Sequence, residues 1–193
     1  GIFETYIEPI LILINIMTGF VLLSMRKKTR RFYAVLFVFV LIFDLVRFST
    51  SVAENMDYQL LRVGLLSVFY TIVTIEIILQ VWQAKKVNKN VIFGVMGGYV
   101  SLGLVAFFLL LGILIAEPDA FRGLEHVMED GLSDHLLYYA YITLMTIGYG
   151  DIVPIEPLSQ KAAILIGLWG QFYLVIITAV VVGKYIVSGG EKD

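Results

Sequence analysis

Long apolar runs separated by short polar segments dominate the chain. Runs of this kind, with few or no charges, occupy residues 10–25, 32–48, 63–82, 91–116 and 162–183. A helix of about 20 apolar residues crosses a hydrocarbon core of about 30 Å, and a longer one does so by tilting. Strands of a spanning barrel would be about ten residues long and alternating, so that architecture is excluded. The pattern predicts an all-α membrane protein with five transmembrane helices per chain.

Composition agrees with this interpretation. Of the 193 residues, 59% are hydrophobic and 16% are charged, whereas soluble domains are roughly half apolar and about a quarter charged. Cysteine is absent, which excludes disulfides and thiolate metal sites. No GxSxG, HExxH or P-loop pattern occurs. We therefore expect a protein that is not an enzyme, has no cofactor and binds no nucleic acid.

The charged residues divide the connecting segments into two sets. Basic residues cluster in residues 26–31, 85–89 and 184–192, whereas acidic residues gather before residue 10 and in residues 54–57 and 117–134. The positive-inside rule places the basic set in the cytoplasm. The sequence thus predicts a multi-pass protein of the cell membrane or bacterial inner membrane, with its N-terminus outside and its C-terminus cytoplasmic.

The interval between the fourth and fifth runs is the most informative part of the chain. Residues 117–133 are polar and acidic, and residues 135–145 are apolar and aromatic but too short to span. The hexapeptide TIGYGD follows at residues 146–151. Its two glycines allow backbone conformations in which successive carbonyls point the same way, and non-helical backbone at membrane depth survives where it lines a water-filled path. A buried half-helix and an oxygen-lined cation path are predicted; the alternative is a chance glycine turn in an outer loop.

This hexapeptide resembles TVGYGD, the signature of tetrameric potassium channels, with Ile147 in place of valine. The longer stretch YYAYITLMTIGYGDIVP also resembles their pore helix and filter, with Tyr138 and Tyr139 where many members carry tryptophans. The resemblance covers about residues 136–187. It implies a homotetramer of bacterial type that conducts K⁺ through a central pore in the lipid bilayer, without a voltage sensor or a cytosolic ligand domain.

The resemblance also implies roles for single residues. The carbonyls of the filter would coordinate the permeant K⁺, with Gly150 completing the strand; the coordinating residues are Thr146, Ile147, Gly148 and Tyr149. Asp151 would place a ring of carboxylates at the outer mouth. Filter support would come from Tyr138, Tyr139, Thr143 and Met145. One chain supplies one filter strand, so four copies are needed.

A division into two parts follows. Residues 1–90 would form a three-helix membrane domain, and residues 91–193 a pore domain. The expected parts of the pore domain are an outer helix at 91–116, a turret at 117–133, a pore helix at 135–145, the filter at 146–151 and an inner helix at 159–187.

The inner helix is expected to carry the gate. By the resemblance Gly170 lies where a hinge glycine is common, although it could equally allow close helix packing. One helical face, placed on the cavity and gate by the same comparison, contains Gln171, Leu174, Val175, Thr178 and Val182. Val182 could form a constriction that closes by dewetting, or could simply pack.

Ionisable residues inside the predicted spans are Asp44, Arg47 and Glu76. A voltage-sensing helix needs several arginines at every third position, because each elementary charge contributes only about 2.3 kcal/mol per 100 mV. No such helix occurs. An Asp44–Arg47 ion pair and a protonated or hydrogen-bonded Glu76 are expected instead, with weak voltage dependence. His126 and His135 have no metal-site spacing.

Two other functions remain open. A less selective cation channel is one, although nonselective relatives commonly lose the aromatic residue that this chain keeps as Tyr149. A non-conducting membrane subunit or a transporter is the other, although transporter relatives usually carry four non-identical filter loops in one chain and this chain has one.

Overall fold

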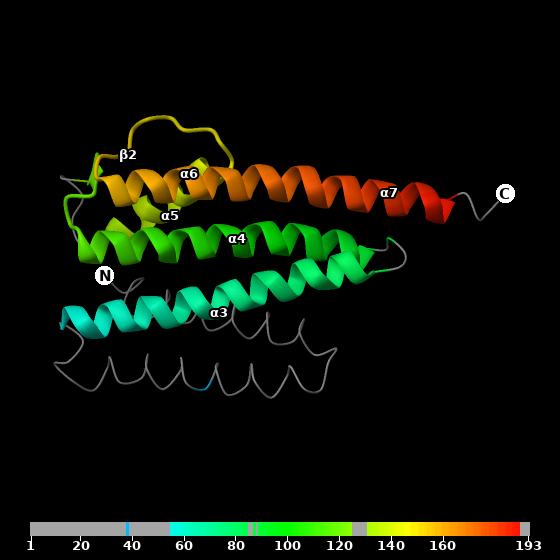
Figure 1. Cartoon of the computed structure of the whole chain (residues 1–193), viewed down its shortest axis with the longest axis horizontal. Helices are drawn as coiled ribbons and strands as arrows, with labels where there is room; N and C mark the ends of the chain where they lie inside the picture. Colours follow the sequence, from blue (N-terminus) through cyan, green and yellow to red (C-terminus); the bar gives the residue numbers. More distant parts are fainter. Residues whose placement is uncertain (1–37, 39–54, 85–86, 88, 125–130, 190–193) are drawn as a thin grey trace.

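The computed structural model describes residue 38 and residues 55–84, 87, 89–124 and 131–189. The first two predicted spans lie outside these residues apart from Val38, as do Asp44, Arg47 and His126. The described part is almost entirely helical (Figure 1). Its helices are α3 (Met56–Gln83), α4 (Lys89–Ala116), α5 (Leu132–Leu144), α6 (Pro157–Phe172), the π-helix η4 (Tyr173–Ile177) and α7 (Thr178–Gly189).

Three helices of the described part are long and apolar enough to cross a membrane: Met56–Gln83, Val91–Ala116 and Pro157–Ile186. They correspond to the last three predicted spans, so the prediction of a helical multi-pass membrane protein is confirmed. The helix α3 begins earlier than its apolar run, because the side chain of Asn55 accepts a hydrogen bond from the backbone N–H of Asp57 at 3.0 Å and caps the polar first turn.

The helices α3 and α4 pack side by side along their length (Figure 1). Aromatic and small polar side chains form this contact: the rings of Tyr70 and Phe108 stack at 5.2 Å, and the hydroxyls of Thr74 and Ser101 lie 2.7 Å apart in a buried site. Hydroxyl contacts of this kind hold helices together where lipid provides no hydrophobic drive. The third span is therefore firmly attached to the fourth.

The helix α4 also contacts α5 and α6, so it lies at the centre of the described part. The side chains of Leu110, Leu136, Leu144 and Ile166 are fully buried where these three helices meet. The short helix α5 is thus held inside the protein, as non-helical or short elements at membrane depth must be.

A two-stranded sheet that the sequence did not predict joins the two ends of the segment around α5. The strand β1 (Phe121–Arg122) pairs antiparallel with β2 (Val153–Pro154). The carbonyl of Ala120 extends this link by accepting hydrogen bonds from the Ile155 N–H at 3.0 Å and the Ser159 hydroxyl at 2.9 Å. The segment after residue 151 is therefore anchored next to the start of α6.

The last span, predicted as an inner helix at residues 159–187, extends from Pro157 to Gly189 and contains one irregular turn. It begins at Pro157, whose fixed φ and missing N–H suit a first helical turn. One turn, Tyr173–Ile177, is π-helical, and α-helical geometry resumes at Thr178. π-helical turns are rare and often mark functional positions.

Candidate functional site

The C-terminal end of α5 lies next to residues 146–148, and the helix is held in place by contacts with α4. The hydroxyl of Tyr141 donates a 2.7 Å hydrogen bond to the carbonyl of Val100 in α4. The ring of Tyr141 lies against Gly103, where any Cβ would collide with it. The helix begins three residues before the predicted pore helix and ends at Leu144, one residue before its predicted end.

The backbone after α5 folds back on the end of that helix. The N–H groups of Met145 and Thr146 donate to the carbonyls of Tyr141 and Thr143 at 2.8 and 3.0 Å. The next two N–H groups, of residues 147 and 148, both donate to the carbonyl of Ile142, at 2.8 and 3.4 Å. Four successive N–H groups are therefore turned toward α5 and away from the opposite side of the strand.

The backbone of residues 146–150 alternates in handedness. Positive φ values occur at Thr146 (57°), Gly148 (57°) and Gly150 (82°), and Thr146 is the one non-glycine residue with positive φ in the described part of the chain. A Cβ at Gly148 or Gly150 would meet no atom within 4 Å. Backbone conformation, rather than lack of space, therefore requires glycine at both positions.

This geometry leaves a row of carbonyl oxygens available. Among the described residues no donor bonds the carbonyls of residues 146–150, and all five residues are exposed in the single chain. Tyr149 is 71% exposed and Ile147 is 47% exposed, so both side chains are open to a neighbour in the single chain. The arrangement can bind a cation through oxygen dipoles and presents apolar side chains that a neighbouring molecule could cover.

The end of this strand carries one carboxylate with a defined partner. A side-chain hydrogen bond from the hydroxyl of Tyr138 lowers the pKa of Asp151, and backbone hydrogen bonds and the nearby His135 act in the same direction. The same bond raises the pKa of Tyr138. His135 itself lies 2.9 Å from the carbonyl of Gly131, measured from Nδ1. Asp151 is therefore ionised at and well below neutral pH.

The other predicted support residues differ in their surroundings. Tyr139 is buried with its ring 5.6 Å from that of Phe121, so it supports the loop before α5. Thr143 is half-buried and supplies the carbonyl that receives the Thr146 N–H. Met145 is exposed. Glu76, the ionisable residue of α3, is half-buried and far along the chain from this site.

The inner helix touches the strand at two points. A Cβ at the buried Gly170 would collide with the carbonyl of Leu144, the last residue of α5. One residue later, the side-chain amide of Gln171 donates to the hydroxyl of Thr146 at 3.2 Å. Gly170 thus has a packing role, one of the two that its sequence allowed, while its hinge role stays a prediction.

The departure from α-helical geometry begins three residues after Gly170, at Tyr173. The remaining residues of the predicted cavity face are exposed in the single chain: Leu174, Val175, Thr178 and Val182. A π-helical turn holds more residues than an α-helical turn, so the even spacing assumed for this face does not hold across η4. Their place on a pore stays a prediction.

Two contacts of the inner helix with other helices could not be predicted from the apolar pattern. The hydroxyl of Tyr173 donates to the carbonyl of Val95 in α4 at 2.6 Å, and its ring packs over Gly98. Further along, Lys184 donates to the carbonyls of Val81 and Trp82 near the end of α3. A glycine within an apolar span indicates that another element approaches closely. Gly98 was therefore the one sequence feature that could have indicated the contact of Tyr173 with α4. In the described ranges no group of three His, Asp or Glu side chains could hold a metal ion.

One comparison with known proteins covers this same part of the chain. Residues 101–187 match a family described as ion channel. A two-pore potassium channel 5 from Arabidopsis thaliana is 35% identical over 95 residues, which is 48% of this chain and 22% of that protein. The chain therefore spans about a fifth of the length of this curated relative. No solved structure matches. The segment from the middle of α4 to the end of the inner helix, including residues 146–151, is thus similar to ion channels.

Proposed function

We propose that this chain forms a potassium-selective channel in which the carbonyls of residues 146–149, with the Thr146 hydroxyl, replace the hydration shell of K⁺. The observation that carries the proposal is the alternation of positive φ at Thr146, Gly148 and Gly150, combined with N–H groups that bond back to α5. Together they leave a row of oxygens on one side of the strand, which is the arrangement of a cation filter.

The proposal requires several copies of the chain. One strand offers oxygens from one direction, and the side chains of Ile147 and Tyr149 are left largely exposed by the described part of the chain. The inner helix adds exposed apolar residues, among them Val175 at 64%. A homotetramer around a central pore would close the oxygen ring and cover these side chains.

Electrostatics favour a cation at both ends of this path. The carbonyl end of α5 carries a partial negative charge and lies next to residues 146–148. The carboxylate of Asp151 lies at the other end, and its lowered pKa keeps it ionised. The similarity of residues 101–187 to ion channels, and the word potassium in the name of the plant relative, support the same proposal.

Weak voltage dependence is part of the proposal. The described helix α3 contains a single arginine, Arg62, near its N-terminal end. One such charge is far below the several that steep gating requires. The gate is assigned to the inner helix between the π-helical turn and Val182.

Flux into liposomes tests this function. Purified protein is reconstituted with K⁺ or Na⁺ gradients, and we expect K⁺ flux to exceed Na⁺ flux strongly. Gly148→Ala forces a side chain into positive φ at a cost of about 1–2 kcal/mol, so it should reduce K⁺ flux about tenfold. Tyr149→Asp should abolish selectivity. Gly97→Ala, at a helical glycine with open space around it, is the matched control and should conduct normally.

Comparable K⁺ and Na⁺ flux would favour a less selective cation channel. An assembled tetramer in which neither filter variant alters flux would show that residues 146–150 are not the ion path.

A further inference from the structure

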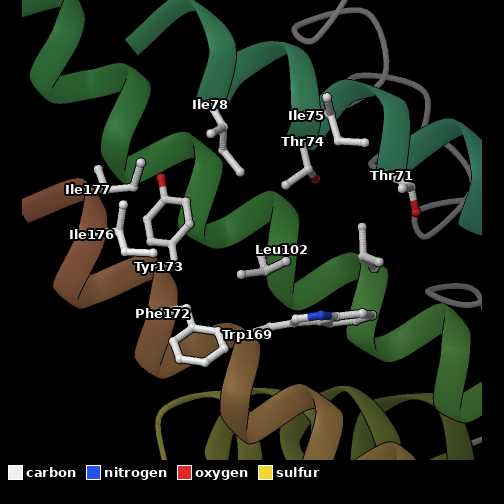
Figure 2. Close-up of a pocket in the computed structure, with 11 residues that line it drawn as sticks. Thr71, Thr74, Ile75, Ile78, Leu102, Trp169, Phe172, Tyr173, Ile176 and Ile177 are labelled. Carbon is white, nitrogen blue, oxygen red and sulfur yellow. The ribbon is translucent and has the colours of Figure 1, made fainter. Parts of the chain in front are cut away.

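An apolar cavity lies between α3, α4 and the π-helical turn of the inner helix. Its volume is about 390 Å³. Figure 2 shows Ile75 and Ile78 of α3 on one side, Phe172 and Ile176 of the inner helix on the other, and Leu102 of α4 between them. Cavities of about 300–1,000 Å³ are typical of ligand sites.

The three hydroxyl groups in the lining are already paired. The hydroxyl of Thr71 donates to the carbonyl of Ser67, and that of Thr74 to the carbonyl of Tyr70, each at 2.7 Å. The hydroxyl of Tyr173 is paired with the carbonyl of Val95. The lining contains no charged residue. A water cluster, an ion or a polar ligand would therefore find few partners there, whereas an apolar chain would find many.

The mouth of the cavity is apolar as well. Ile75, Phe172 and Ile176 are each about half exposed, so the apolar lining continues onto the surface of two helices long enough to cross the membrane. Ile75 lies eight residues from the end of α3 at Gln83, which is about 12 Å along the helix axis. At that depth the surrounding medium is lipid hydrocarbon, and an empty cavity would forfeit dispersion contacts on its lining.

We propose that this cavity binds one acyl chain of a membrane lipid, and that the bound chain regulates the inner helix. The regulatory part rests on the proposed channel function. The cavity contacts Tyr173, Ile176 and Ile177 of η4, so a bound chain packs directly against the π-helical turn. Occupancy then stabilises this geometry of the turn relative to a regular helix, because the ligand contacts it in one geometry and not the other.

The chain provides its own probe of binding. It has two tryptophans, Trp82 and Trp169, and Trp169 lines the cavity. In a Trp82→Phe background, reconstituted into phosphatidylcholine with brominated acyl chains, we expect strong quenching of Trp169 fluorescence. Filling the cavity from either wall, with Ile78→Phe or Ile176→Phe, should at least halve this quenching. Val68→Phe, at an exposed α3 position outside the lining, is the matched control and should leave it unchanged.

Two results would overturn the acyl-chain site. The first is quenching that both filling variants leave unchanged. The second is weak quenching in the oligomer that rises when the oligomer dissociates. That result would mean that a second copy of the chain, rather than lipid, covers the cavity in the oligomer. Quenching needs no ion flux, so a non-conducting protein can still pass this test. For the regulatory part, both filling variants should change K⁺ flux at least threefold relative to Val68→Phe; reduced quenching without a flux change would overturn regulation alone.

Discussion

The side-chain amide of Gln171 donates a hydrogen bond to the hydroxyl of Thr146 across 3.2 Å, joining the inner helix to the first residue of the proposed filter. Among the described residues, Thr146 is the one non-glycine residue with a positive φ. This conformation is strained for a residue with a side chain, so it needs support from its surroundings. The bond therefore links the geometry of the filter to the position of α6.

Removing that donor should loosen the filter. A single hydrogen bond contributes about 0.5–1.5 kcal/mol net, so Gln171→Leu should lower the ratio of K⁺ to Na⁺ flux by up to about tenfold. The liposome assay measures this ratio. Gln80→Leu, at an exposed residue near the end of α3, should leave it unchanged. An unaltered ratio in Gln171→Leu would show that the bond has no part in selectivity.

The pair Tyr138 and Asp151 predicts the response to external acid. Because the hydrogen bond from Tyr138 is the largest cause of the lowered pKa of Asp151, Tyr138→Phe should raise that pKa toward its ordinary value. A carboxylate with a lowered folded-state pKa stays charged until the pH falls below its ordinary value. The variant should thus lose K⁺ flux at a higher pH than the wild type does.

The control for this pH shift is Asp151→Asn, which removes the titrating group. In Tyr138→Phe combined with Asp151→Asn, the acid response attributed to this pair should be missing altogether. An acid profile that Tyr138→Phe leaves where it was would contradict the role of the hydrogen bond.

The apolar pattern was sufficient to predict the three spanning helices of the described part and the short helix before residues 146–151. Length and hydrophobicity alone distinguish a helix such as α4 from one such as α5, and TIGYGD marked the backbone reversal through its glycines. The helix ends were predicted less accurately than the helices themselves. Polar first turns, such as that of α3 at Met56, belong to the helix but not to the apolar run.

Other features depend on contacts between segments distant in the sequence. The pairing of β1 with β2 joins residues separated by more than thirty positions, and each strand has two residues, too few for an alternating pattern. The π-helical turn at Tyr173–Ile177 coincides with the bond from Tyr173 to Val95 of α4. No local signal in the run of apolar residues distinguishes this turn from its neighbours.

Two glycines of α6 form a matched pair for testing its packing on α5. Gly170→Ala would press a methyl group into the carbonyl of Leu144, and overpacking of this kind costs about 1–3 kcal/mol. Gly167→Ala places its Cβ about 4.0 Å from the carbonyl of Thr143, an ordinary contact, and gains helix propensity. We expect the first variant to lower the thermal unfolding temperature in detergent and the second to maintain or raise it.

Equal unfolding temperatures for these two variants would show that α6 can move away from Leu144 at little cost. Flux measurements on the same pair address the hinge role of Gly170. A variant that is less stable yet gates normally would leave Gly170 with a packing role alone.

The contact of Lys184 with the end of α3 predicts that the inner helix and the third span move together. The ammonium group donates to the carbonyls of Val81, at 3.1 Å, and Trp82, and so stabilises the negative end of the α3 dipole. Such a contact contributes about 0.3–1 kcal/mol when exposed and up to about 2 kcal/mol when partly buried. Lys184→Met, which keeps most of the side-chain volume, should lower the free energy of unfolding by an amount in this range. Because the contact joins α7 to α3, Lys184→Met should also change K⁺ flux severalfold. Lys184→Arg should restore the flux in part, because a cation remains. Lys161→Met, at an exposed position of α6, is the control and should behave as wild type. A flux change of equal size in the methionine and arginine variants would mean that side-chain shape, rather than the charge that binds the α3 carbonyls, couples the two helices.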